Sequence, residues 1–192
     1  MSGPARVLLV DPPWRFGDAL GKRGADAQYR TMTAAELMDM GLPPLAPDCL
    51  LLLWRVAAMQ AEALAVVSAW GFVLKSEIVW IKLARAKTRR APCATCSRDP
   101  SPKHFGMGRY VRASHETCLV AVRGKVSVVD HSVRSVFEAP VREHSRKPDE
   151  IHRIAERLVP GGPYVELFGR EHRPGWTVLG DEVGKFTVEE AP

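Results

Sequence analysis

Short apolar runs separated by helix-like segments constrain the fold of this 192-residue chain more than any other feature. Several runs are nearly continuous instead of alternating with polar residues, as expected of central strands that are covered on both faces. Strands that alternate with helical segments of about 10–15 residues predict a mostly parallel, doubly wound α/β sheet with helices on both faces. The expected strands span residues 7–10, 49–54, 73–81, 117–122, 164–168 and 176–179.

Local signals place helices between these strands. Thr33 and Glu36 have the spacing of a capping box, and Gly41 stands where the helix that they open would end. The Ala-rich stretch 56–70 carries apolar residues at helical spacing. Pro148, which two acids follow, suits the first turn of a third helix.

The composition predicts one intracellular domain. Because 46% of the residues are hydrophobic, the chain can bury one substantial core, and we expect residues 1–192 to form a single domain. No apolar run approaches the ~18 residues of a membrane span, and the N-terminus lacks the layout of a signal peptide. Cys49 and Cys118 fall in expected strands, which favours reduced core thiols and a cytoplasmic location.

Cys93 and Cys96 form a lone CxxC pair between the third and fourth expected strands. A zinc site needs more ligands than this pair supplies, and His104 and His115 are the nearest histidines in the sequence. We therefore expect no metal, with metal binding and a redox role as the less favoured alternatives.

The charge is concentrated in one segment. The net charge is +5, yet residues 82–112 contain nine Lys or Arg and a single acid, Asp99, so the rest of the chain is mildly acidic. A solvated loop is one interpretation of this segment. Contact with the phosphates of a nucleic acid is the other, because phosphate neutralisation releases counterions and drives nonspecific affinity. We expect substrate loops at 15–30 and 82–112.

The first apolar run ends directly in Asp11, Pro12, Pro13 and Trp14. The Asp11 carboxylate and the Pro12 carbonyl could accept hydrogen bonds from both N–H groups of a nucleobase amine, which would aim its lone pair at an electrophile. The two prolines restrict the backbone, and Trp14 could stack a base that has been flipped out of a duplex. The plainer alternative is a turn followed by a core tryptophan.

Further motifs follow DPPW in order: YRTM at 29–32, VWIK at 79–82, GRYVRASHETCLVAVRG at 108–124, SRKPDE at 145–150 and VELFGREHRPGWTVLGDE at 165–182. Together they resemble the adenine-N6 methyltransferase family that includes the catalytic subunit of the eukaryotic messenger-RNA writer and bacterial and phage DNA enzymes. The resemblance implies a permuted Rossmann-like fold, in which the catalytic strand precedes the cofactor strand, and S-adenosylmethionine as cofactor.

The same resemblance assigns roles to residues. Asp11 would face the cofactor ammonium and the adenine amine, and Lys147 would meet the cofactor carboxylate. Two residues near the cofactor adenine, Asp181 and Glu182, stand where the messenger-RNA writer has amides. The implied catalytic residues are Asp11, Pro12, Pro13 and Trp14. The implied cofactor-binding residues are Asp11, Lys147, Glu166, Phe168, Gly169, Arg170, His172, Asp181 and Glu182. The expected substrate-binding residues are Trp14, Tyr29, Lys87, Arg89, Arg90, Arg112, His115 and Glu116.

These features predict methyl transfer from S-adenosylmethionine to the N6 amine of adenine in nucleic acid. We expect DNA as the substrate, because a compact chain without a separate recognition domain resembles a bacterial or phage enzyme. RNA and a catalytically silent nucleic-acid-binding scaffold are the alternatives. Methylation of cytosine N4 is disfavoured, since enzymes of that type usually carry serine at the position of Asp11. The expected partners are nucleic acid and a second copy or second subunit, and no membrane.

Overall fold

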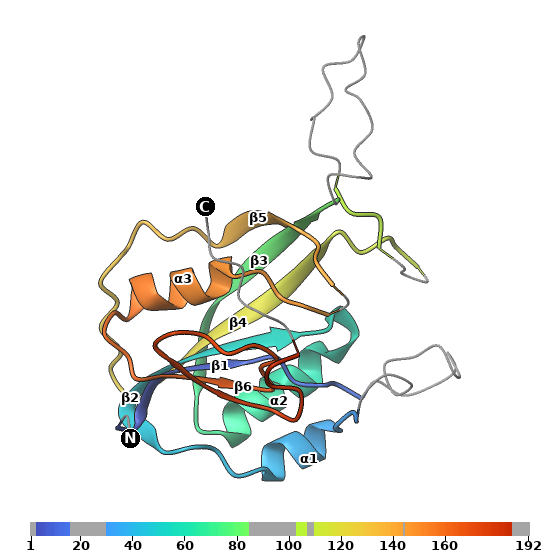
Figure 1. The fold of residues 1–192 in the computed structure, drawn as a ribbon. Helices are drawn as coiled ribbons and strands as arrows, with labels where there is room; N and C mark the ends of the chain where they lie inside the picture. The colour runs from blue at the N-terminus through green and yellow to red at the C-terminus, as the bar shows by residue number, and fades with distance from the viewer. Residues whose placement is uncertain (1–2, 16–29, 85–102, 107–109, 144, 186–192) are drawn as a thin grey trace.

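The computed structural model describes residues 3–15, 30–84, 103–106, 110–143 and 145–185. They form one seven-stranded sheet in the order β5–β3–β4–β2–β1–β6–β7, with helices on both faces (Figure 1). The strands are β1 (Ala5–Val10), β2 (Leu45–Arg55), β3 (Val73–Leu83), β4 (His115–Arg123), β5 (Val136–Pro140), β6 (Tyr164–Leu167) and β7 (Trp176–Leu179).

The sheet is mixed but mostly parallel. β4 runs antiparallel to its neighbours β2 and β3, whereas the other four strand pairs are parallel. This architecture confirms the predicted Rossmann-like α/β fold. β5 was not predicted from the sequence. It is short, contains Glu138 and Pro140, and pairs only with β3 at the sheet edge, where a proline and a charge are tolerated.

The helices are α1 (Ala34–Asp39), α2 (Gln60–Ala69), which follows the 3₁₀ turn η3 (Ala57–Met59), and α3 (Glu150–Leu158). The capping box is confirmed, because the Thr33 hydroxyl accepts from the Glu36 N–H while the Glu36 carboxylate accepts from the Thr33 N–H. α1 and α2 lie on one side of the sheet and α3 on the other (Figure 1). Among the described residues, no helix has the length and apolar character needed to cross a membrane.

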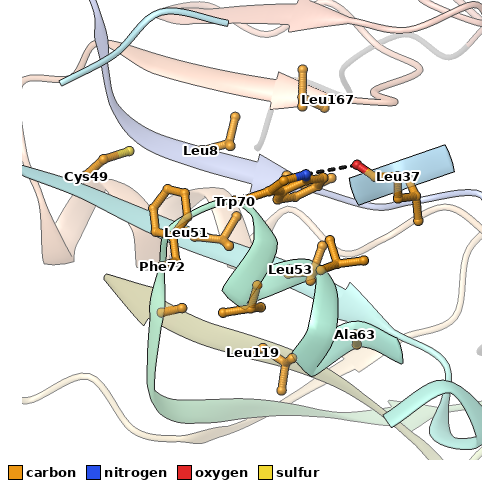
Figure 2. Packing of buried hydrophobic residues seen from close by; sticks show 14 of the residues in the cluster. Leu8, Leu37, Cys49, Leu51, Leu53, Ala63, Trp70, Phe72, Leu119 and Leu167 are labelled. Carbon is orange, nitrogen blue, oxygen red and sulfur yellow. Dashed lines mark hydrogen bonds between the residues drawn. The ribbon is translucent and has the colours of Figure 1, made fainter. Parts of the chain in front are cut away.

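Two hydrophobic clusters hold these layers together, one on each face of the sheet. In the cluster beneath α1 and α2, the indole N–H of Trp70 donates to the carbonyl of Leu37 at 2.9 Å, which ties the end of α2 to α1 (Figure 2). Cys49 lies in this cluster and Cys118 in the other, and both are buried free thiols, as predicted.

The strand order reverses between β1 and β6. β1 leads to β2 on one side of the sheet, whereas β6 leads to β7 on the other side. β1 and β6 are parallel neighbours with Val10 beside Leu167, so the segments that follow them leave the same edge of the sheet. In open α/β sheets, ligands bind at such a switch point, beyond the carboxyl ends of the strands.

Candidate active site

Asp11 leaves β1 at this switch point, beside the end of β6. Its N–H donates to the Leu167 carbonyl at 3.4 Å, which extends the β1–β6 ladder by one residue. Pro12 and Pro13 then end the strand, because neither has an N–H to continue the ladder. The Pro12 carbonyl already accepts the Trp14 N–H at 2.8 Å, so one of its two lone pairs is engaged in a turn.

Trp14 lies in the core. Its side chain is 4% exposed, and its indole N–H donates to the Trp54 carbonyl at 3.0 Å. In this structure the indole therefore holds the DPPW turn against β2, as in the plainer sequence alternative, and presents no open face to a base. The stacking role suggested for Trp14 remains a prediction.

A chain of alternating charges crosses the ends of β1, β4 and β3. The Lys147 ammonium lies 2.8 Å from the Asp11 carboxylate and 3.4 Å from that of Glu116. Glu116, on β4, also binds the ammonium of Lys82, near the end of β3, at 2.5 Å. The Lys147 ammonium lies 5.6 Å from the centre of the Trp54 ring, where a cation–π contact adds to its stabilisation.

The pKa values of this cluster reflect burial and pairing. Burial is the largest influence on Asp11 and raises its pKa above the usual 3.8, although Lys147 opposes the shift. Burial alone would lower the pKa of Lys147, but the two carboxylates outweigh it and raise that pKa above 10.5. Burial would likewise raise the pKa of Glu116, yet Lys147 and Lys82 lower it. The cluster therefore stabilises a charged Lys147 and Glu116, whereas burial makes Asp11 easier to protonate than a free carboxyl group.

Buried ion pairs fix the loop that carries Lys147. Arg142 donates to the Lys147 carbonyl and pairs with Asp149 at 3.0 Å. Arg146 pairs with Glu171 at 2.7 Å, and both of these side chains are almost fully buried. The loop between β5 and α3 is thus tied to the segment that follows β6, which holds the Lys147 ammonium over the end of β1.

A cleft that is open to solvent lies between these two segments. The sequence-predicted cofactor residues that line it are Asp11, Lys147, Glu166, Phe168, Gly169 and Arg170. Gly169 is required by close packing, because a Cβ there would lie 2.3 Å from Cγ1 of Val178.

His152 also lines the cleft and was not predicted as a site residue. Its Nε2 lies 2.9 Å from the Glu166 carboxylate, and its ring packs edge-on against Trp176. The imidazole is 4% exposed, and its Nδ1 has no hydrogen-bond partner among the described residues. A polar residue at an apolar helix position of IHRIAERL was the sequence signal that could have identified it.

The remaining predicted residues are not gathered in the cleft. Glu182 reaches toward it, with its carboxylate 3.6 Å from Nε of Arg170. His172 and Asp181 are exposed and do not line it. Arg112 and His115 are exposed near the start of β4. Tyr29, Lys87, Arg89 and Arg90 lie outside the described residues, as do Cys93 and Cys96.

Comparison with known proteins gives one family match. The MT-A70 family model matches residues 5–182. An N(6)-adenosine-methyltransferase MT-A70-like protein of Drosophila melanogaster is 30% identical over 94% of this chain, and the N(6)-adenosine-methyltransferase subunit METTL3 of Danio rerio is 31% identical over 94%. The N(6)-adenine-specific methyltransferase METTL4 of Homo sapiens is 28% identical over 94%. The chain spans 27%, 28% and 38% of these three relatives, respectively.

Proposed function

Because the chain belongs to the MT-A70 family, we propose that it transfers a methyl group from S-adenosylmethionine to the N6 amine of adenine in nucleic acid. MT-A70 methyltransferases use this cofactor as methyl donor. The observation that carries the proposal is the Asp11–Lys147 pair, 2.8 Å apart, at the mouth of a cleft that the segment after β6 also lines.

The chemistry of the cleft fits the cofactor. The amino-acid end of S-adenosylmethionine carries an ammonium and a carboxylate, and the Asp11–Lys147 pair offers the complementary charges. Lys147 would hold the carboxylate and Asp11 the ammonium, while Glu166, which His152 orients, would accept from the ribose hydroxyls. Bound S-adenosylmethionine supplies an electrophilic methyl group.

Asp11 would also bind the adenine amine. The carboxylate stands at the end of β1, and the Pro12 carbonyl beside it keeps one lone pair free of the Trp14 N–H. Two acceptors on one amine favour a pyramidal nitrogen with its lone pair directed away from them. Because the amine proton can leave after methylation, Asp11 contributes orientation and charge and does not need to act as a strong base.

The polymer we propose is RNA, with DNA second. The sequence led us to expect DNA from a bacterial or phage enzyme. Two of the three relatives named above are called adenosine methyltransferases, which indicates a ribonucleoside, and the third is called adenine-specific. All three come from eukaryotes, so they give no support to a bacterial or phage origin.

A methyl-transfer assay tests this proposal. The purified protein is given radiolabelled S-adenosylmethionine and single-stranded RNA, single-stranded DNA or duplex DNA, and the products are identified by nucleoside mass spectrometry. We expect N6-methyladenosine in RNA. Asp11→Asn should lower the rate at least about 100-fold, comparable to the loss of one key electrostatic contact. Asp39→Asn, an exposed carboxylate at the end of α1, is the matched control.

Each outcome separates the alternatives. Methylation of DNA but not RNA would restore the DNA interpretation. Cofactor binding without transfer to any of these polymers would favour the silent scaffold. An Asp11→Asn variant as active as wild type would refute the role proposed for the DPPW aspartate.

A further inference from the structure

Two aromatic side chains in the connection between β3 and β4 are largely open to solvent. Phe105 is 74% exposed and Tyr110 is 91% exposed, although aromatic rings generally bury most of their surface. Both come from the connection between β3 and β4, in the segments 103–106 and 110–114, which leave the ends of these strands (Figure 1). The two residues lie close together in the sequence, and exposed apolar groups that gather in one region mark interaction sites.

These segments are attached to the sheet by specific contacts. The His104 N–H donates to the Lys82 carbonyl at 2.7 Å, and the Lys82 N–H donates to the Ser114 carbonyl at 2.8 Å. Gly106 packs so tightly against the second segment that a Cβ there would lie 2.2 Å from the Ala113 oxygen. The backbone that carries the two aromatics is therefore anchored at the end of β3.

Lys82 connects these segments to the charged residues around Asp11. Lys82, whose backbone holds the aromatic segments, binds Glu116 through its side chain, and Glu116 lies 3.4 Å from the Lys147 ammonium. Lys147 in turn pairs with Asp11. The segments that carry the aromatic side chains thus leave the sheet at the same edge as the DPPW turn, where the end of β2 lies between the start of β4 and the end of β1.

Positive charge accompanies the aromatics. The Arg112 guanidinium lies 5.1 Å from the centre of the Phe105 ring, and Lys103 bridges to the last residue of β3. Across residues 82–112 the sequence has nine basic residues and one acid. Aromatic rings interleaved with cations are the combination that binds single strands, because bases stack on the rings while phosphates meet the cations.

We propose that Phe105 and Tyr110 form a stacking platform for unpaired bases of a single-stranded nucleic acid, with Arg112 contacting its phosphates. The platform would hold the nucleotides next to the target adenine. Its role in methylation therefore rests on the proposed function. Bases within a duplex are stacked on each other and offer no free face to Phe105 or Tyr110. The platform therefore favours a single strand over a duplex.

Binding of labelled oligonucleotides tests the platform without requiring catalysis. The full chain is titrated into fluorescein-labelled single-stranded RNA, single-stranded DNA and duplex DNA of equal length, and the dissociation constant is measured by anisotropy at several salt concentrations. Phe105→Ala and Tyr110→Ala should each weaken single-strand binding by about 5- to 150-fold, which corresponds to 1–3 kcal/mol per stacked base. Phe105→Trp should preserve binding.

Salt dependence distinguishes stacking from charge. Phe105→Ala should leave the slope of log affinity against log salt unchanged, whereas Arg112→Gln should reduce it by about 0.7 for one lost phosphate contact on a single strand. Val129→Ala is the matched control, since Val129 is 65% exposed and lies beyond the opposite end of β4. Unchanged S-adenosylmethionine affinity would show that each variant is folded.

The results of the binding experiment can be distinguished from those of the methyl-transfer assay. Wild-type affinity in both Phe105→Ala and Tyr110→Ala, or an equal loss for duplex and single strand, would overturn the platform even if the protein methylates RNA. Failure of the wild-type protein to bind any single strand would overturn it as well. A selective loss of single-strand binding in a protein that transfers no methyl group would support the platform and refute the proposed activity.

Discussion

Replacing Lys147 with methionine tests the charge cluster most directly. Methionine keeps most of the length and the apolar stem of lysine but removes the ammonium, so Asp11 and Glu116 lose their shared partner. Glu116 retains Lys82, whereas the described structure shows no other ion pair for Asp11. The substitution should therefore destabilise mainly the Asp11 carboxylate, at the end of β1.

The magnitude follows from burial. Removing one partner from a buried ion pair costs about 3–5 kcal/mol. The side chains of Asp11 and Glu116 are 22% and 30% exposed, so water screens part of the loss and the expected cost is about 3 kcal/mol or less. For a chain of this size, the full cost of about 3 kcal/mol would lower the melting temperature by roughly 6–12 °C, and a smaller cost would lower it proportionately less.

The loss should depend on pH in a defined direction. The pKa of Asp11 is already raised above 3.8, and removal of the cation raises it further. A carboxyl group with a raised folded pKa favours folding while it is protonated and loses that contribution as pH rises through the folded value. The deficit of Lys147→Met relative to wild type should therefore be smaller at pH 5 than at pH 7.5. The Asp11→Asn/Lys147→Met double variant should recover part of it.

Thermal unfolding at the two pH values and calorimetric titration with S-adenosylmethionine provide the measurements. Lys147→Met should also bind the cofactor at least about 10-fold more weakly, because one charge-assisted hydrogen bond is lost. Lys125→Met, an exposed lysine just beyond the end of β4, is the control. Wild-type stability at both pH values together with wild-type cofactor affinity would refute the proposed role of the cluster.

Two further substitutions test the wall of the cleft. Gly169→Ala should cost about 1–3 kcal/mol in the free energy of unfolding and weaken cofactor binding, because its Cβ would collide with Val178. Gly41→Ala, where a Cβ meets nothing within 4 Å, should change neither, and equal melting curves for the two variants would contradict the packing argument. His152→Leu should leave the Glu166 carboxylate without its partner and weaken cofactor binding several-fold, whereas His152→Gln should retain most of the affinity. A His152→Leu protein that binds the cofactor like wild type would show that this hydrogen bond does not orient Glu166.

The strands of the central sheet were predictable because their signal is local. β1 and β2 contain the continuous apolar runs 7–10 and 49–54, whose side chains are buried on both faces of the sheet. The capping box at Thr33 was also predictable, because both of its hydrogen bonds join residues three positions apart. β5 was missed because an edge strand has one paired neighbour and needs no continuous apolar run. The antiparallel direction of β4 could not be foreseen, since no residue within a strand encodes its direction.

The candidate site, too, was only partly predictable from the sequence. The motif order identified Asp11, Lys147 and the segment after β6 as members of one site. Their geometry depends on contacts between distant residues, and Lys147 reaches Asp11 across 136 positions of the chain. The sequence could not show that Trp14 is buried against β2 instead of open to a base, because its partner is the Trp54 backbone carbonyl, and any residue type has a carbonyl.

By itself, the sequence determined the fold class, the family and the chemical types gathered at the site, because apolar periodicity and short motifs are properties of neighbouring residues. Only the tertiary structure decided that Lys147 bridges Asp11 and Glu116, that His152 holds Glu166, and that Phe105 and Tyr110 remain exposed. Burial and charge pairing are set by which strand ends and loops come together at one edge of the sheet, and that arrangement is a property of the whole fold.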